Sequence, residues 1–200
     1  MIDRNIVFDF GGVLMQHNRP GCLQAFRQLM SDDDISHLLG LGNDSRDTLR
    51  YRFEVGELST RSFIDSVLGH CRAAATEQQI IDAWNTIHAG IPDTVWTQIR
   101  LLRNRGYHIY LMSNTDELHW EHTLALYREP IEELFDAIFL SFRIGCAKPD
   151  KQFFETVDRA IHAAPEPTLF VDDTEVNRLA AQQTVGWQTC ATVSELMQKI

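Results

Sequence analysis

Apolar and polar residues follow two different rhythms along this chain. Residues 6–10 form a short apolar run, IVFDF, followed at once by two glycines, which predicts a buried strand ending in a tight turn. From about residue 19 to residue 89, apolar residues recur at spacings of three and four, which predicts a series of helices. We expect no strand within that stretch.

Beyond Pro92 the pattern changes to a regular alternation of helices and strands. The predicted helices cover residues 94–106, 117–127, 151–164 and 175–186, and the predicted strands cover residues 107–113, 137–141, 168–173 and 187–192. Such alternation implies parallel strands joined by crossover helices. The expected fold class is therefore α/β, with a parallel sheet as its core.

The position of the helical stretch predicts two domains. Residues 1–16 and 91–200 would form the sheet domain, and residues 17–90 would form a helical bundle inserted after the first strand. We expect this cap to pack above one end of the sheet. Ser59 or Thr60, and Thr76, are the expected N-caps of two cap helices.

Composition and charge exclude several functional classes. The 200 residues are 44% hydrophobic and 23% charged, which is typical of a globular protein with a core of its own. A net charge of −10 argues against nucleic-acid binding. The four cysteines form no CxxC pair, and no apolar run approaches the roughly 20 residues of a membrane span. With no signal peptide visible, we expect a cytoplasmic protein without a membrane partner, either monomer or homodimer.

Polar residues able to bind ions follow three of the predicted strands, and a lysine precedes a predicted helix. These residues are Asp9, Ser113 with Asn114, Lys148, and Asp172 with Asp173. In an open α/β sheet, ligands bind beyond the carboxyl ends of the strands, where these segments would meet. Their common location therefore gives them more weight than their residue types alone.

The acidic residues suggest a nucleophile and a cation site. A carboxylate at the end of a buried strand is costly unless it is paired or binds a metal, so Asp9 is a candidate to attack phosphorus. Gly11 and Gly12 leave backbone groups free to face phosphate and metal. The adjacent Asp172 and Asp173 would repel each other without a cation, and Mg²⁺ prefers carboxylate and carbonyl oxygens. Turn-capping or solvated acids are the alternative interpretation.

The remaining residues suggest an anion site. The Ser113 hydroxyl and an exposed N–H near Asn114 could bind phosphoryl oxygens, although both residue types are also ordinary helix caps. Lys148, followed by Pro149 at a predicted helix start, could balance the charge of phosphate and carboxylates, or could simply be solvated. Taken singly, these signals are weak. Their occurrence in this order makes the joint hypothesis of a phosphate site much stronger.

The segments IVFDFGGVL, LMSNT, Lys148-Pro149 and FVDDTEVN resemble the four motifs of the haloacid dehalogenase-like hydrolases. The resemblance covers the whole chain and implies a Rossmann-like sheet, with helices on both faces and an inserted helical cap. The cap stretch YRFEVGELSTRSF is similar to caps of small sugar-phosphate phosphatases, such as bacterial α-glucose-1-phosphate phosphatases.

The resemblance also implies roles for individual residues. Asp9 would form an aspartyl-phosphate, and Lys148 would orient it. Asp9, the Gly11 carbonyl and Asp173 would bind Mg²⁺, with Asp172 as a ligand or as a partner behind the ligands. Gly12, Ser113 and Asn114 would contact the phosphoryl group. The implied activity is Mg²⁺-dependent hydrolysis of a small phosphorylated metabolite, with a sugar phosphate expected.

Gly11 departs from the family pattern, in which most phosphatases carry a general acid and base at that position. Losing such a group typically costs about 10²–10⁴ in rate. One alternative is therefore a phosphate-binding pseudo-phosphatase without turnover. A phosphorylated signalling receiver is disfavoured because its acid pair would precede the phosphorylated aspartate. The dehalogenase branch is disfavoured because the acid pair implies a metal.

Several histidines remain open. His17 and Arg19 follow the first motif and could contact substrate or replace the missing acid. His119 and His122 lie three residues apart on a predicted helix and are expected to be surface or partly buried residues. A zinc site there would need a third ligand, which the sequence does not supply.

Overall fold

The computed structural model of this chain describes residues 3–40 and 46–200. A five-stranded parallel sheet with the strand order β3-β2-β1-β4-β5 forms its centre. The strands are β1 (Asn5–Phe8), β2 (His108–Ser113), β3 (Ala137–Leu140), β4 (Leu169–Val171) and β5 (Gln188–Cys190). The predicted α/β fold is thus confirmed, with small differences at strand ends.

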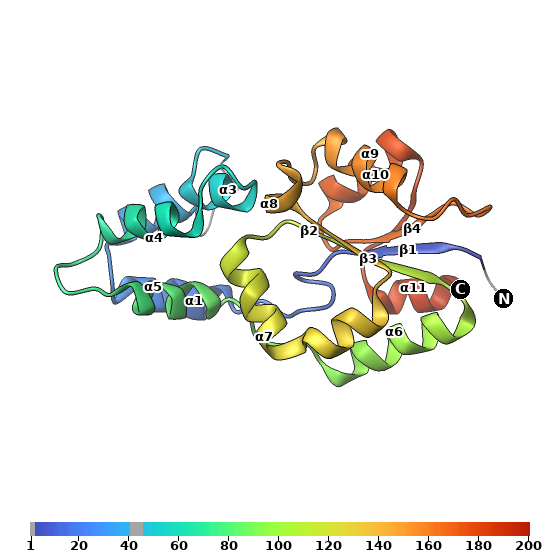
Figure 1. Cartoon of the computed structure of the whole chain (residues 1–200), viewed down its shortest axis with the longest axis horizontal. Coiled ribbons are helices and arrows are strands. Elements are labelled where there is room, and N and C mark those ends of the chain that lie inside the picture. Colours follow the sequence, from blue (N-terminus) through green and yellow to red (C-terminus); the bar gives the residue numbers. More distant parts are fainter. Residues whose placement is uncertain (1–2, 41–45) are drawn as a thin grey trace.

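Helices cover both faces of the sheet (Figure 1). They are α6 (Asp93–Arg105), α7 (Glu117–Leu134), α8 (Ser141–Ile144), α9 (Lys151–Ala160), α10 (Glu175–Val185) and α11 (Val193–Lys199). Because side chains alternate across a strand, Ile6 and Phe8 pack into the cluster that includes α6, α7 and α11, whereas Val7 packs with α9 and α10. Strand β1 is therefore buried on both sides.

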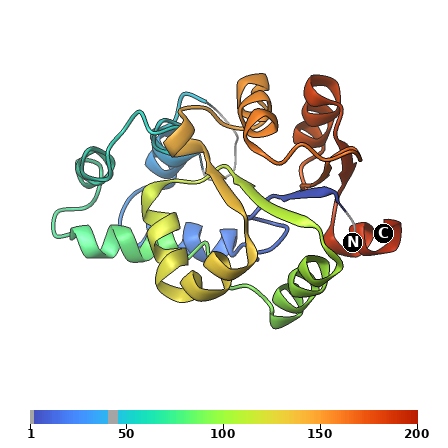
Figure 2. The same ribbon diagram turned by 45° about the vertical axis from the view of Figure 1, so that its right-hand side comes forward.

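The stretch between β1 and α6 is helical in its described part. Its elements are α1 (Arg19–Arg27), α2 (Asp32–Asp34), the π-helical η1 (Ile35–Leu39), α3 (Leu49–Glu54), α4 (Thr60–Leu68) and α5 (Glu77–Asn85). They lie at one end of the molecule (Figures 1 and 2) and enclose an apolar cluster of their own. Phe26, Phe53, Phe63 and Trp84 form its centre through ring contacts.

The predicted N-caps of this helical stretch are confirmed. The Ser59 side chain accepts a hydrogen bond from the Ser62 N–H at the start of α4. Thr76 forms a reciprocal capping box with Gln79 at the start of α5. Each cap satisfies backbone donors that have no partner within their helix, which explains why these two boundaries were readable from sequence.

Three element boundaries differ from prediction for identifiable reasons. Helix α7 continues to Leu134 beyond a kink at Tyr127, because Pro130 fits the first turn of the helical segment that follows the kink. Strand β3 ends at Leu140, and Ser141 starts the unpredicted short helix α8. Helix α9 ends at Ala160 rather than at residue 164, because the backbone of His162 bonds to sheet side chains instead.

The described residues include no helix that is both long and apolar enough to cross a membrane.

Candidate active site

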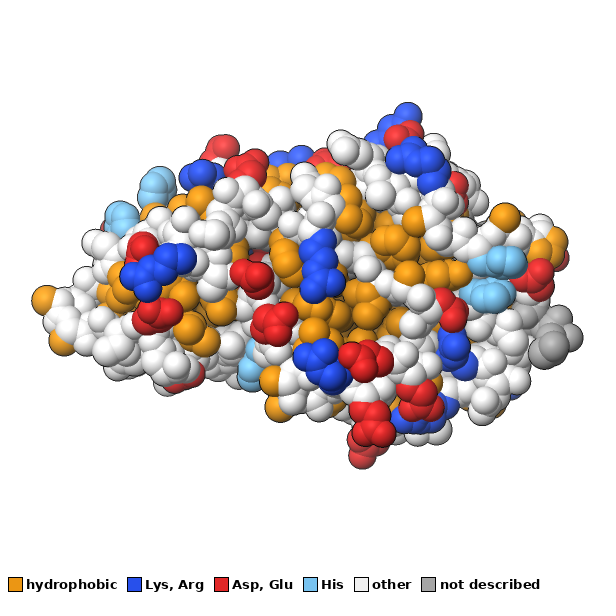
Figure 3. Space-filling view, in the orientation of Figure 1, with side chains coloured by type: hydrophobic (Ala, Val, Ile, Leu, Met, Phe, Trp, Pro, Cys, Tyr) orange, Lys and Arg blue, Asp and Glu red, His pale blue; other side chains and the backbone are white. Residues whose placement is uncertain are grey.

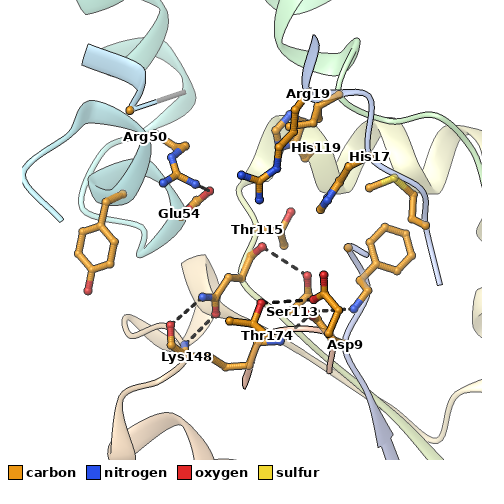
Figure 4. A pocket seen from close by; sticks show the side chains of 18 of the residues that line it. Asp9, His17, Arg19, Arg50, Glu54, Ser113, Thr115, His119, Lys148 and Thr174 are labelled. Atoms are coloured by element: carbon orange, nitrogen blue, oxygen red, sulfur yellow. Dashed lines mark hydrogen bonds and ion pairs between the residues drawn. The ribbon is translucent and has the colours of Figure 1, made fainter. Parts of the chain in front are cut away.

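A cavity of about 580 Å³ lies between the carboxyl ends of β1, β2 and β4 and the inserted helices. Figure 4 shows Asp9, Ser113, Thr174 and Lys148 on the sheet side of this cavity, with Arg19, His17, Arg50 and Glu54 facing them. Strand β1 ends at Phe8, so Asp9 is the first residue beyond the sheet. The topology therefore places the predicted residues at one edge, as their strand-end positions implied.

Lys148 joins two carboxylates in the floor of the cavity. Its Nζ atom lies 2.8 Å from Asp9 Oδ1 and 2.6 Å from Asp172 Oδ2. All three side chains are buried. Burial acts to lower the pKa of the Lys148 ammonium, but the two carboxylates outweigh it and raise that pKa. Lys148 is therefore a fixed positive charge rather than a solvated lysine.

Asp9 is buried beside one positive and one negative charge. Burial raises the pKa of Asp9 to about 7, although Lys148 acts in the opposite direction, and Asp172 adds to the increase. Its Oδ1 atom accepts hydrogen bonds from the Phe10 N–H and pairs with Lys148. These contacts fix the orientation of the carboxylate toward the cavity.

Asp172 and Asp173 are adjacent but have different surroundings. Asp172 is fully buried and accepts hydrogen bonds from the Thr174 N–H at 2.9 Å and from Asn177 Nδ2 at 3.1 Å. Asp173 is exposed and lines the cavity. One carboxylate oxygen from each of Asp9, Asp172 and Asp173 lies within 4.8 Å of the others. The geometry thus offers Asp173 for direct contact with a ligand and keeps Asp172 behind it.

Gly12 permits the close approach of Asp173 to the first loop. Its φ of +79° lies in the left-handed region, which other residues rarely adopt. A Cβ atom at this position would also collide with the Asp173 carboxylate. Glycine is therefore required here both for the turn and for the convergence of two segments from opposite ends of the chain.

Asn114 has a different side-chain contact from the one expected. Its Nδ2 atom donates to the Lys148 carbonyl at 2.9 Å, and its Oδ1 atom accepts from the Lys148 N–H at 2.8 Å. The side chain therefore holds the Lys148 loop in place, and only the backbone of Asn114 remains for an anion. Ser113 is buried at the end of β2 and lines the cavity, as predicted. Pro149 lies just outside α9 rather than in its first turn.

Gly11 also faces a neighbour that the sequence pattern did not reveal. A Cβ atom at Gly11 would lie 2.5 Å from the Cε1 and Nε2 atoms of His17. The imidazole therefore occupies the space into which a side chain at position 11 would point. Burial lowers the pKa of His17, and the positive charge of Arg19 lowers it further. A side chain at position 11 could be accommodated only if His17 moved.

His119 is more deeply buried than predicted. It is 9% exposed, and its Nδ1 atom lies 2.8 Å from Asp116 Oδ2 while its Nε2 atom lies 3.0 Å from the Trp84 carbonyl. Burial acts to lower the pKa of His119, but Asp116 outweighs it and raises that pKa. His122 is only partly buried beside His88. His119 therefore ties α7 to α5 and forms one wall of the cavity.

Sequence reasoning missed most of the residues that the inserted helices contribute. Arg46, Arg50, Tyr51 and Glu54 line the cavity opposite Asp9. Arg50 Nη1 pairs with Glu54 at 3.4 Å, one helical turn away. The i,i+4 spacing within LRYRFE identifies an ion pair. It does not identify the direction in which the helix faces, because that depends on packing against α8.

Comparison with known proteins decides the family. The family model described as haloacid dehalogenase-like hydrolase matches residues 4–183. The chain belongs to the haloacid dehalogenase-like hydrolases. The resemblance identified from the four motifs is thereby confirmed, and the Rossmann-like sheet with an inserted helical stretch is the fold of this hydrolase family.

Several relatives match this hydrolase over nearly its whole length. A D-ribitol-5-phosphate phosphatase of Bacteroides thetaiotaomicron is 31% identical over 93% of this chain and 90% of its own. A sesquiterpene phosphatase of Aspergillus oryzae is 29% identical over 97% of this chain and 95% of its own. A haloacid dehalogenase family enzyme of Bacteroides thetaiotaomicron, solved in complex with magnesium and inorganic phosphate, is 28% identical. It superposes with a TM-score of 0.82 over 94% of this chain and 93% of its own.

Proposed function

We propose that this hydrolase is a Mg²⁺-dependent phosphatase that hydrolyses small phosphorylated sugars or polyols through an aspartyl-phosphate on Asp9. The observation that carries the proposal is the position of Asp9. It lies in the floor of a 580 Å³ cavity, 2.8 Å from a buried lysine and close to two further carboxylates. The phosphatase activities named for relatives of full-length similarity support the same reaction class.

The carboxylate cluster fits a magnesium ion. Asp9, Asp172 and Asp173 bring three negative charges together, and Lys148 offsets only part of them. Their donors are all oxygen atoms, which suit Mg²⁺ better than zinc or copper. Asp9, Asp173 and the Gly11 carbonyl would hold the ion, with Asp172 behind them orienting Lys148. Bound there, Mg²⁺ would neutralise charge on the phosphoryl oxygens.

The reaction then proceeds in two displacements. An oxygen of Asp9 attacks phosphorus, the new Asp–O–P bond forms, and the bond from phosphorus to the leaving oxygen breaks, with that oxygen taking a proton from water. Water next attacks the same phosphorus and gives a proton back to the solvent, which releases inorganic phosphate and restores the Asp9 carboxylate. Ser113 and backbone N–H groups of the loops beginning at Gly11 and Asn114 would contact the phosphoryl oxygens. Their contribution is positioning and charge stabilisation.

The side chains that the inserted helices contribute to the cavity favour a polar substrate. Arg19, Arg50, Tyr51 and Glu54 line the side of the cavity that faces Asp9, and they offer donors and acceptors for hydroxyl groups. We assign residues 1–16 and 91–200 to the catalytic core and residues 17–90 to a substrate-binding cap. Gly11 supplies no acid to the leaving oxygen, so phosphates with stable leaving groups should react faster.

A substrate panel tests the proposal. Phosphate release is measured from p-nitrophenyl phosphate, glucose 1-phosphate, D-ribitol 5-phosphate and farnesyl phosphate, with Mg²⁺ or with EDTA. We expect Mg²⁺-dependent turnover of the sugar and polyol phosphates. Turnover confined to farnesyl phosphate would contradict the polar substrate class and leave the chemistry standing. No turnover of any compound would favour the pseudo-phosphatase alternative.

The substitution Asp9→Asn tests whether Asp9 is the nucleophile. We expect a loss of about a thousandfold or more in kcat, because removing a nucleophile leaves only binding and charge stabilisation. Asp33→Asn is the matched control, since Asp33 is an exposed aspartate at the start of a cap helix. Residual activity of Asp9→Asn comparable to that of the control would refute the role of Asp9.

A further inference from the structure

The described residues contain a second group of metal-ligating side chains, at the opposite edge of the sheet from Asp9. Asp3 precedes β1, His108 is the first residue of β2, and His162 follows α9. One ligand atom from each lies within 4.8 Å of the other two. From residue 3 to residue 9 the extended chain spans roughly 20 Å, so this group is separate from the phosphatase cavity.

The geometry of the three side chains is close to that of a tetrahedral metal centre. Asp3 Oδ1 lies 3.1 Å from His162 Nε2 and 3.5 Å from His108 Nε2. Ligand atoms bound to one tetrahedral zinc ion are about 3.3 Å apart, given metal–ligand bonds of about 2.0–2.1 Å. Both histidines therefore already direct Nε2 at the same carboxylate oxygen, and small rotations would bring all three atoms onto one ion.

The backbone at the two histidine ligands is held by contacts independent of any metal. Asn5 Nδ2 donates to the His162 carbonyl at 2.7 Å, and the His162 N–H donates to the Tyr110 hydroxyl at 3.1 Å. The His108 N–H donates to the Arg4 carbonyl at 3.0 Å, next to Asp3. Binding would therefore require little ordering of the main chain.

The surroundings of His108 also favour metal binding. Its Nδ1 atom, on the side of the ring away from Asp3, lies 3.9 Å from Asp136 Oδ2. The Asp136 carboxylate thus places a negative charge behind the imidazole, which favours a cation bound at Nε2. All three ligands keep part of their surface exposed, so water can complete the coordination. Figure 3 shows a pair of histidine side chains beside an acidic group on this part of the surface.

From this geometry we propose that Asp3, His108 and His162 bind one divalent transition-metal ion of the zinc type. Two imidazoles and one carboxylate suit Zn²⁺, Ni²⁺ or Co²⁺ rather than Mg²⁺. The ion would fasten the segment before β1 to the start of β2 and to the loop after α9. The bound ion would stabilise this end of the sheet, and phosphatase turnover does not depend on the ion.

Zinc binding to the tag-free full chain tests the proposal. Isothermal titration with Zn²⁺ is carried out in the presence of excess Mg²⁺ and on an Asp173→Asn background, which weakens competing binding at the carboxylate cluster near Asp9. We expect one ion per chain and a Zn²⁺-dependent rise in Tm. His108→Ala, His162→Ala and Asp3→Asn should each weaken binding by at least about tenfold.

His70→Ala is the matched control, because His70 also pairs with an aspartate, Asp34, at 3.2 Å on the surface. It should leave both the affinity and the Tm rise unchanged. Asp3→Asn keeps the shape of the side chain, so a general folding defect is excluded if its Tm without metal equals that of the parent. Absence of binding, or binding that survives all three ligand substitutions, would overturn the proposal and leave the trio as a hydrogen-bonded cluster.

Discussion

At the scale of single residues, the active-site floor depends on one buried ammonium. Lys148 contacts Asp9 and Asp172, and both carboxylates would lose their counter-charge if it were removed. A buried charge pair contributes little net stability, yet breaking it by removing one partner is strongly destabilising. Lys148 therefore contributes to the stability of the fold, whatever it contributes to the proposed reaction.

We predict that Lys148→Met lowers the free energy of unfolding by about 3–5 kcal/mol. The measurement is urea denaturation well above pH 7, where Asp9, with its pKa of about 7, is ionised in the parent. Loss of Lys148 would raise that pKa further, so the variant either keeps an unpaired buried charge or must take up a proton. Lys151→Met is the control, because Lys151 is 71% exposed in its pair with Glu155. Its change should stay within about 0.5 kcal/mol. Equal effects of the two substitutions would contradict the burial argument.

A second residue-scale prediction concerns Gly12. Gly12→Ala and Gly186→Ala both introduce a side chain at positive φ, so each should lower stability by about 1–2 kcal/mol. Only the Cβ at position 12 would collide with Asp173, whereas a Cβ at position 186 meets nothing within 4 Å. Gly12→Ala should therefore also raise the Mg²⁺ concentration needed for half-maximal activity. The prediction fails if both variants keep the parental Mg²⁺ dependence.

At the scale of elements, helices α5 and α7 are joined through a buried polar group. Asp116 accepts hydrogen bonds from Trp84 Nε1 at 3.1 Å and from the His119 N–H at 3.0 Å, and it pairs with the His119 ring. These contacts connect the inserted helices with the sheet domain. They also position one wall of the cavity, so the orientation of the inserted helices depends partly on a titratable pair.

This pair predicts a pH dependence of stability. The folded state raises the pKa of His119 above its unfolded value of about 6.5, so its stabilising contribution is complete below that pH. The contribution is lost as pH rises through the folded pKa. The difference in unfolding free energy between the parent and His119→Gln should therefore shrink with increasing pH in urea titrations. A difference that is constant with pH would show that His119 acts only through packing and hydrogen bonds.

At the scale of the whole molecule, separate apolar clusters meet at one ligand cavity. The sheet buries side chains on both faces, and the inserted helices bury their own set around Phe63 and Trp84. Contacts between the two parts include polar ones, such as Thr60 with Glu117 and Ser141 with the Glu54 carbonyl. A ligand that touches both sides of the cavity would add contacts between them.

We therefore predict that Mg²⁺ with inorganic phosphate raises the melting temperature, and that EDTA reverses the effect. A ligand present at a hundredfold excess over its Kd stabilises the folded state by about 2.7 kcal/mol. Scanning calorimetry is the measurement, with Asp173→Asn as the variant expected to lose the Mg²⁺-dependent part. A shift of the same size in that variant would place the ion away from the carboxylate cluster.

The sequence by itself determined the parallel sheet, the helical insertion and the edge at which Asp9, Ser113, Lys148, Asp172 and Asp173 meet. These features follow from local periodicity and from the rule that parallel strands end at a common edge. The tertiary structure decided how those residues divide their roles. Asp172 is buried and Asp173 exposed, and the Asn114 side chain holds the Lys148 backbone.

The same limit explains why the cap contribution was not foreseen. Arg50 and Glu54 line the cavity together with residues that lie far from them in the chain. His17 fills the space beside Gly11 because the chain turns back after the first strand. Periodicity identifies which face of a helix is apolar but not which neighbour that face meets. The orientation of polar side chains toward a shared cavity is therefore a property of packing, which only the folded arrangement specifies.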